Sequence, residues 1–348
     1  VLALYGLYFL AYNLRAGYPY VSYTLSAISF IMLIAVPILT MRSMAEERHS
    51  RTDQLVLTAP VSLGKMIFGK FLAMVGVFTV AVAVIAVTPL VLAAFGTVPM
   101  GENYVAVLGF WLYGCTCIAV GMLASALTES QVIAAVVAFA FLFLGYMMNS
   151  ITGLIGDHLI TKVLGAYDLY TPLQSFMSGC LDLTGVVYFV SVTALCLFLT
   201  CQCVQKRRWS MTTKKLTTGM FSVAMIVVGF AVAVAVNMVV KEMPSSWTAV
   251  DATSTKLYSL TDTTKDYVKN LSQDVTIYVL SSEKSADSTL AETLQRYEDL
   301  SKHLNVVYKD PAKSPNFYQQ YTDSAPSQNS MIVVSDARSR VVDYSDIY

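Results

Sequence analysis

Long apolar runs fill the first two-thirds of the chain and are separated by short polar connectors. A helix that crosses the hydrocarbon core of a bilayer needs about 20 apolar residues. This pattern therefore predicts a polytopic α-helical membrane protein with about seven transmembrane helices, of which we expect the first to be partial. The predicted spans are Val1–Tyr12, Val21–Met41, Phe68–Phe95, Tyr104–Leu127, Val132–Ile151, Val186–Val204 and Met220–Val240.

After Lys241 the pattern changes to alternating strand and helix signals. Helices are predicted at Thr263–Leu271, Thr289–Leu304 and Asn316–Tyr321, and strands at Val275–Leu280, Asn305–Lys309, Ser330–Val334 and Arg340–Tyr344. A β-α-β-α-β-β order is typical of a thioredoxin-like or related layered α/β fold. The chain ends at Asp346-Ile347-Tyr348 in a strand-like pattern, so we expect this domain to be incomplete.

Composition supports this division into two parts. Apolar residues make up 55% of the chain and charged residues 13%, whereas a soluble domain carries about 25% charged residues. The charges are sparse before Lys241 and frequent after it, which predicts membrane lipid around the first part and water around the last. The net charge is zero and no dense basic run occurs, so we expect no nucleic-acid partner.

Basic residues gather at the second and sixth connectors between the predicted spans. They are Arg42, Arg48, Arg51, Lys65 and Lys70, and Lys206, Arg207, Arg208, Lys214 and Lys215. Short loops rich in Lys and Arg face the cytoplasm. We therefore predict a multi-pass protein of the cell membrane with a cytoplasmic N-terminus and an extracytoplasmic C-terminal domain.

The second connector is the most informative polar segment. It is compatible with a helix from Met41 to about Leu57, which is then broken at Ala59-Pro60. Ser62 is a candidate cap for the next helix. Leu55 and Leu57 give the charged segment an apolar side with which to dock. Such a helix can transmit force from a cytoplasmic partner, and the alternative is a merely solvated loop.

The same connector carries a motif. Glu46-Glu47-Arg48, Thr52-Asp-Gln-Leu55, Leu57-Thr-Ala-Pro-Val-Ser62 and Gly69-Lys70 resemble the signature of type-2 ABC transporter permeases, with Arg51 and Gln54 in place of the family's Gly and Glu. The resemblance implies a permease domain over 1–204 that works as a homodimer or pseudo-dimer. It also implies that this connector is the coupling helix, which contacts a separate ATP-binding-cassette ATPase subunit. The residues expected at that contact are Met44, Glu46, Glu47, Arg48, Thr52 and Leu55.

Catalytic and metal-binding patterns are weak. A Gly-x-x-x-x-Gly-Lys-Ser/Thr phosphate loop does not occur in the sequence, so we expect no enzyme activity and no cofactor in this chain, with ATP and Mg²⁺ bound by the partner. Cys115-x-Cys117 and Cys201-x-Cys203 lack nearby ligands to complete a metal site and are better interpreted as buried apolar residues. Asp157-His158 is either a catalytic or metal pair or, more simply, part of an exposed loop.

Two further features concern the permease domain. The Gly- and Tyr-rich stretch 165–174 is a possible external gate, with Tyr167, Asp168, Tyr170 and Pro172 as its candidate residues. Small residues in the fourth predicted span favour close helix packing rather than a substrate site; they are Gly114, Gly121, Ala124 and Ser125.

The last third resembles the start of the gliding-motility-type ABC transporter auxiliary component. The matching segments are Lys256–Thr261, Val275–Leu280, Val306–Pro311, Ile332–Val334 and Arg338–Val342. The resemblance implies a natural fusion, with a cytoplasmic linker at 205–218, a seventh transmembrane helix at 219–241 and an auxiliary domain at 242–348. The predicted function is the permease subunit of an exporter. The alternative is a non-transporting complex that acts mechanically on an envelope partner.

Overall fold

The computed structural model divides the chain into two compact units, Val1–Glu242 and Met243–Tyr348. Each unit is described by itself below. The residues that the structure describes are 1–52, 62–155, 165–209, 215–241, 243, 248–252, 262–271, 273–282, 286–311, 314, 316–322, 324–335 and 338–347.

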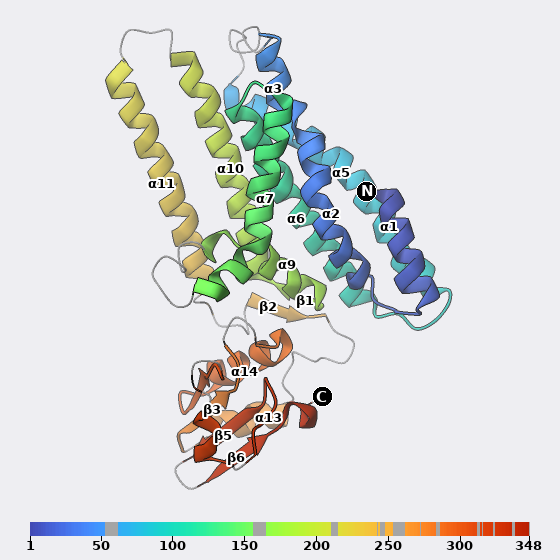
Figure 1. The fold of residues 1–348 in the computed structure, drawn as a ribbon, viewed down its shortest axis with the longest axis vertical. Coiled ribbons are helices and arrows are strands. Elements are labelled where there is room, and N and C mark those ends of the chain that lie inside the picture. Colours follow the sequence, from blue (N-terminus) through green and yellow to red (C-terminus); the bar gives the residue numbers. More distant parts are fainter. Residues whose placement is uncertain are drawn as a thin grey trace. The chain divides into compact units, whose positions relative to one another are not determined.

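Helices dominate the first unit (Figure 1). The long ones are α2 (Ser22–Thr40), α5 (Leu63–Ala93), α6 (Met100–Leu127), α7 (Gln131–Ile155), α10 (Leu183–Trp209) and α11 (Lys215–Lys241). The shorter elements are α1 (Leu2–Tyr8), the π-helix η1 (Phe9–Arg15), α3 (Arg42–His49), η2 (Gly165–Tyr167), α9 (Tyr170–Met177) and the strand β1 (Cys180–Asp182). The linker predicted over 205–218 is thus helical at both ends.

Five helices in the described part of the chain are long and apolar enough to cross a membrane. They are Ser22–His49, Leu63–Ala93, Met100–Leu127, Gln131–Ile155 and Leu183–Gln205. Each contains most of one predicted span, which confirms a multi-pass helical protein. Ala224–Val240 forms a shorter apolar helix within α11, and the first predicted span corresponds to α1 followed by η1.

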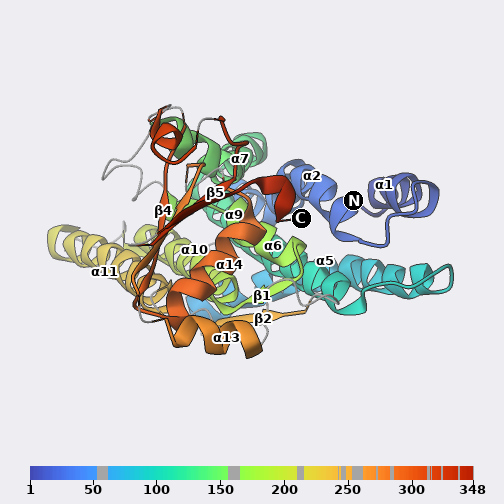
Figure 2. The same ribbon diagram turned by 90° about the horizontal axis from the view of Figure 1, so that it is seen from below.

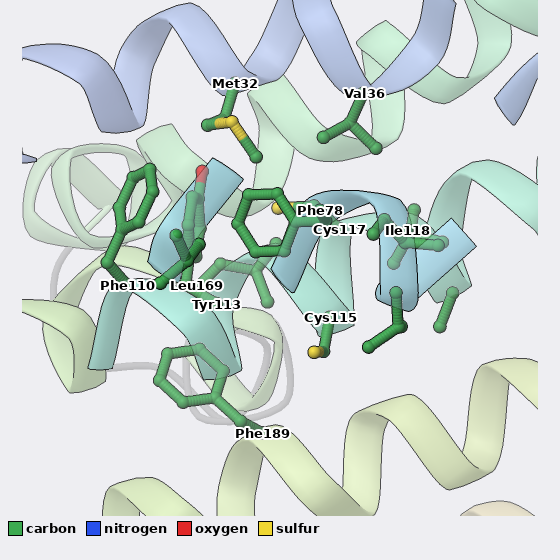
Figure 3. Packing of buried hydrophobic residues seen from close by; sticks show 14 of the residues in the cluster. Met32, Val36, Phe78, Phe110, Tyr113, Cys115, Cys117, Ile118, Leu169 and Phe189 are labelled. Atoms are coloured by element: carbon green, nitrogen blue, oxygen red, sulfur yellow. The ribbon is translucent and has the colours of Figure 1, made fainter. Parts of the chain in front are cut away.

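Helix α6 lies at the centre of the first unit and is the most buried of the five candidate spans. It packs against α2, α5, α7, α9 and α10. Its side chains Phe110 and Tyr113 are fully buried, and Figure 3 shows them between residues of neighbouring helices, among them Met32 of α2 and Phe189 of α10. Small residues permit these crossings, because a methyl group added at Gly114 or Gly121 would overlap Phe78 or Thr40, respectively. The predicted packing role of these two glycines is confirmed.

The second unit is a small mixed sheet covered by helices (Figure 2). Its strand order is β4-β3-β5-β6, in which β3 and β4 are parallel while the β3–β5 and β5–β6 pairs are antiparallel. The elements are β2 (Ala249–Asp251), α13 (Asp262–Lys269), β3 (Val275–Val279), α14 (Ser288–Leu300), β4 (Leu304–Tyr308), η3 (Phe317–Gln320), β5 (Met331–Ser335), β6 (Ser339–Val342) and η4 (Tyr344–Asp346).

Alternating side chains of β3 face two different layers. Ile277 and Val279 pack with Val268 of α13 and with Leu290 and Leu294 of α14. On the other face, the ring of Tyr278 packs against the rings of Phe317 and Tyr321, with centroids 4.9 and 6.2 Å away. This arrangement confirms an α/β layer with a small sheet.

Two predicted features of helix ends are wrong. The helix expected to reach Leu304 ends at Leu300, because Ser301 takes an extended conformation and Leu304 begins β4. Ser62 occupies the N-cap position of α5, but its side chain makes no capping hydrogen bond. The segment Lys256–Thr261, which carried part of the second resemblance, lies outside the described residues.

Candidate functional site

The predicted coupling segment forms the short helix α3. It follows α2 after one residue, Met41, and ends at His49. The prediction of a helix to about Leu57 is therefore wrong at residues 50–52. The hydroxyl of Ser50 donates to the carbonyl of Glu46 at 2.8 Å, and Arg51 has a positive φ of 58°, a conformation that ends a helix. The predicted contact residue Leu55 lies outside the described residues.

A serine from α6 holds the N-terminal end of α3. The Ser125 hydroxyl oxygen accepts hydrogen bonds from the backbone N–H groups of Met44 and Ala45, at 3.1 and 3.0 Å. The same hydroxyl donates to the carbonyl of Met41 at 3.0 Å. Met44, Ala45 and Ser125 are all buried. The first turn of α3 is thus fixed to the end of the central helix.

Two ion pairs hold the sides of α3. Lys70 of α5 pairs with the Glu47 carboxylate and also donates to the backbone carbonyl of Ser43 at 3.2 Å. Arg48 pairs through Nε with Glu129 of the α6–α7 connector at 2.8 Å, and its Nη1 donates to the Leu127 carbonyl at 3.3 Å. Glu47, Lys70 and Arg48 are partly shielded from solvent, which makes these pairs stronger than fully exposed ones.

The predicted contact residues therefore differ in what they offer a partner. Met44 is buried, and Glu47 and Arg48 are engaged within the chain. Glu46 is exposed, and its one described ion pair is a loose contact of 4.0 Å with Arg42. Thr52 is exposed and donates to the carbonyl of Glu47 at 3.3 Å. The side of α3 that carries Glu46 is the side open to another protein.

Sequence reasoning missed the anchors of α3. Lys70 was identified as a basic residue beside the connector and Ser125 as a small packing residue, whereas Glu129 was not identified at all. The Glu47–Lys70 and Arg48–Glu129 pairs span 23 and 81 positions of the sequence, and neither matches a local motif. For Lys70, its place in the Gly69-Lys70 motif was the sequence signal that could have identified it as an anchor of α3.

The four candidate gate residues lie together around η2 and the start of α9. Asp168 accepts hydrogen bonds from the N–H groups of Tyr170 and Thr171, at 3.0 and 3.2 Å, and from the Thr171 hydroxyl at 2.5 Å. Asp168 therefore fixes the first turn of α9, where Pro172 needs no backbone donor.

The two gate tyrosines contact α7. Burial raises the pKa of Tyr167 and, to a smaller extent, of Tyr170, so both phenols keep their protons. Tyr167 donates to the Phe141 carbonyl at 3.4 Å, and the Tyr170 ring lies 4.7 Å from that of Tyr146. A methyl group added at Gly145 would approach Tyr167 and Leu169 within 2.9 Å. The stretch that carries the candidate gate residues is thus packed against α7.

The described residues do not bring the candidate metal ligands together. No group of three or more His, Cys, Asp or Glu residues that could hold a metal ion occurs among them. Cys115 and Cys117 are free and buried in the core. Asp157-His158 lies outside the described residues.

Comparisons with known proteins identify the first unit. Residues 16–204, just over half of the chain, match the family described as ABC-2 family transporter protein. Residues 254–345 match a domain of unknown function, DUF7088. No curated protein and no solved structure matches the chain. Permease domains of the ABC-2 family are membrane components rather than ATPases, and they associate with an ABC ATPase subunit. The chain therefore belongs to the ABC-2 transporter family, as a multi-pass permease subunit of an ABC transporter.

Proposed function

We propose that this chain is the membrane subunit of an exporter that is driven by ATP hydrolysis in a separate subunit. The observation that carries the proposal is the mounting of α3. Its side chains Glu47 and Arg48 and its backbone are fixed to α5, to α6 and to the α6–α7 connector, while Glu46 stays exposed. A helix held in this way moves its neighbours when a partner pushes or pulls on its free side.

The partner in this proposal binds ATP and Mg²⁺ and docks on the exposed side of α3 from the cytoplasm. The cluster of Arg42, Arg48 and Lys70 at this end of the helices supports a cytoplasmic position. The N-terminus is then cytoplasmic and the C-terminal unit extracytoplasmic, with seven spans when α1–η1 and α11 are both counted. Two such permeases form the complete pathway, and the exposed apolar faces of the helices contact lipid or the second copy.

We propose that the C-terminal unit lies outside the cytoplasm and has a binding role. We further propose that its fold is thioredoxin-like. The parallel pair β3–β4 connected through α14, followed by the antiparallel strands β5 and β6, supports this fold. The absence of cysteine after Cys203 argues for binding rather than redox chemistry. We propose that the unit corresponds to the gliding-motility-type auxiliary component. It would bind either the exported substrate or an envelope partner.

The first experiment is recovery of an ATPase subunit with the tagged full-length chain. Replacing exposed Glu46 by Lys should lower that recovery at least about tenfold, because a reversed charge at the docking face costs ~1.4 kcal/mol or more. Asp266→Lys makes the same charge change on the exposed face of α13 and serves as the matched control. A wild-type chain that recovers no ATPase would overturn the proposal.

A second experiment tests export itself. In vesicles that contain the chain and its ATPase, an exporter moves substrate in proportion to the ATP that it hydrolyses. A mechanical complex that acts on an envelope partner would hydrolyse ATP without flux, and that result would favour the alternative function.

A further inference from the structure

The N-terminus of α3 receives its cap from another helix. The first backbone N–H groups of a helix have no partner within it and are usually satisfied by the side chain at the N-cap position. That position in α3 is occupied by Met41, whose side chain makes no capping hydrogen bond. The hydroxyl of Ser125, which lies 84 positions away in the sequence, takes this role for Met44 and Ala45.

The Ser125 hydroxyl uses its full bonding capacity at this position. A serine hydroxyl has one donor and two acceptor lone pairs, and here the donor reaches Met41 while the two lone pairs accept from Met44 and Ala45. Ser125 is fully buried, so water cannot take over these bonds. One helical turn earlier, Gly121 lies directly against Thr40, which lets α6 approach the α2–α3 junction this closely.

The segment 125–129 therefore holds both ends of α3. Ser125 binds its first turn, and Glu129 and the Leu127 carbonyl bind Arg48 in its last turn. The covalent connection to α2 passes through Met41, whose backbone keeps helical φ and ψ angles of −55° and −32°. A displacement of α3 is thus passed to α6 through several fixed side-chain contacts, in addition to its covalent connection to α2.

We propose that Ser125 is a positioning residue for energy coupling, whose hydroxyl couples α6 to the movement of α3. This inference rests on the proposed function, in which a partner moves α3. Helix α6 is suited to the role because it packs against α2, α5, α7, α9 and α10. A shift at its C-terminal end therefore reaches most of the permease helices.

The first test needs no partner. Residue-resolved hydrogen exchange is measured on the full chain in lipid nanodiscs for wild type, Ser125→Ala and Ser29→Ala. Ser29 is a matched control, because it is also fully buried but donates only to the Ser26 carbonyl of its own helix, at 2.7 Å. In Ser125→Ala the amides of Met44 and Ala45 should exchange about fivefold faster, as expected for the loss of a helix cap. Unchanged exchange at both amides would overturn the inference.

A second variant covers the case in which Ser125→Ala does not fold. Ser125→Thr keeps the hydroxyl and should leave exchange at Met44 and Ala45 within about twofold of wild type, because the cap is retained. Fast exchange at these amides in a folded Ser125→Thr protein would count against a capping role for the hydroxyl.

The second test uses the complex with the ATPase subunit. Ser125→Ala should recover as much ATPase as wild type, since the exposed face of α3 is unchanged, and should leave the KM for ATP unchanged. Its kcat for ATP hydrolysis in the complex should fall about fivefold, in parallel with the loss of the cap. An unchanged kcat together with faster amide exchange would show that the cap exists without a part in coupling. If the wild-type chain binds no ATPase, the proposed function fails. The hydrogen-exchange experiment still tests whether Ser125 caps α3, because it does not need the ATPase.

Discussion

The crossing of α2 and α6 gives a sharp test of the packing that supports α3. Replacing Gly121 by Ala adds a methyl carbon that would overlap the Thr40 hydroxyl oxygen and lie 2.9 Å from its Cβ and 3.1 Å from its Cγ2. Thr40 cannot turn away easily, because its hydroxyl donates to the Val36 carbonyl at 2.9 Å and its side chain is fully buried. The two helices must therefore move apart at this crossing.

The expected cost follows from two opposing contributions. Overpacking of a well-packed core costs ~1–3 kcal/mol, while Gly→Ala within a helix contributes ~0.5–1 kcal/mol in favour of folding. The net effect of Gly121→Ala is then a loss of ~1 kcal/mol, within a range of ~0–2.5 kcal/mol. Gly76→Ala on α5 is the matched control, because Gly76 is exposed and a methyl group there meets nothing within 4 Å. Gly76→Ala should therefore show only the stabilising contribution of Ala within a helix, without the overpacking cost.

Thermal unfolding in detergent measures the difference between the two variants. At ~2–4 °C per kcal/mol for domains of 150–250 residues, Gly121→Ala should lower the Tm by several degrees, whereas Gly76→Ala should leave it unchanged or raise it. The double variant Gly121→Ala/Thr40→Ala should recover part of the loss, because the hydroxyl and the methyl group of Thr40 are gone. Equal shifts for Gly121→Ala and Gly76→Ala would refute the assigned contact.

Three more perturbations test other parts of the chain. Reversing the charge of Glu47 or of Lys70 alone should lower the free energy of unfolding by ~1 kcal/mol, and reversing both charges should restore about half of that loss. A double variant whose Tm shows no such recovery would contradict a direct ion pair. Asn237→Leu removes the 2.7 Å bond to Ser191 that joins α11 to α10, and should lower the Tm by an amount equivalent to ~1 kcal/mol; an unchanged Tm would argue against that bond. Truncation of fully buried Ile332 to Ala should cost ~2–5 kcal/mol and expose the second unit to protease, whereas a variant as protease-resistant as wild type would contradict its core position.

The membrane spans could be predicted from sequence because each is an apolar run long enough to cross the bilayer by itself. Tyr104–Leu127, for example, lies entirely within α6. The ends of helices and strands depend on local interactions that cannot be predicted from the hydrophobic periodicity of the sequence. The helical pattern through Leu57 contains no Gly or Pro before Pro60, yet α3 ends at His49 because Arg51 takes a left-handed conformation. Arg51 stands where the type-2 permease signature has Gly, the residue that adopts this conformation most readily.

Only the residues of the candidate site that belong to the sequence motif could be predicted. Glu46, Glu47 and Arg48 were identified from local sequence, and the structure places all three on α3. The residues that anchor α3 from elsewhere in the chain, namely Lys70, Ser125 and Glu129, are harder to identify, because a charged residue at a membrane surface and a Ser in a packed span are both ordinary in a membrane protein. Three-dimensional contacts alone distinguish Ser125 from other serines in packed spans, whereas Lys70 is also marked by the Gly69-Lys70 motif.

The positions of these partners also determine which charge of the motif is available for recognition. Successive residues of an α-helix point about 100° apart around its axis. Glu47 is directed to Lys70 on α5, and Arg48 to Glu129 beyond the end of α6. With these two neighbours fixed on different sides, α3 cannot rotate about its axis without breaking an ion pair. Glu46, which lies about 200° from Arg48, is thereby held toward solvent. We therefore expect charge complementarity with the ATPase to act through Glu46, while Glu47 and Arg48 set the orientation in which that carboxylate is presented.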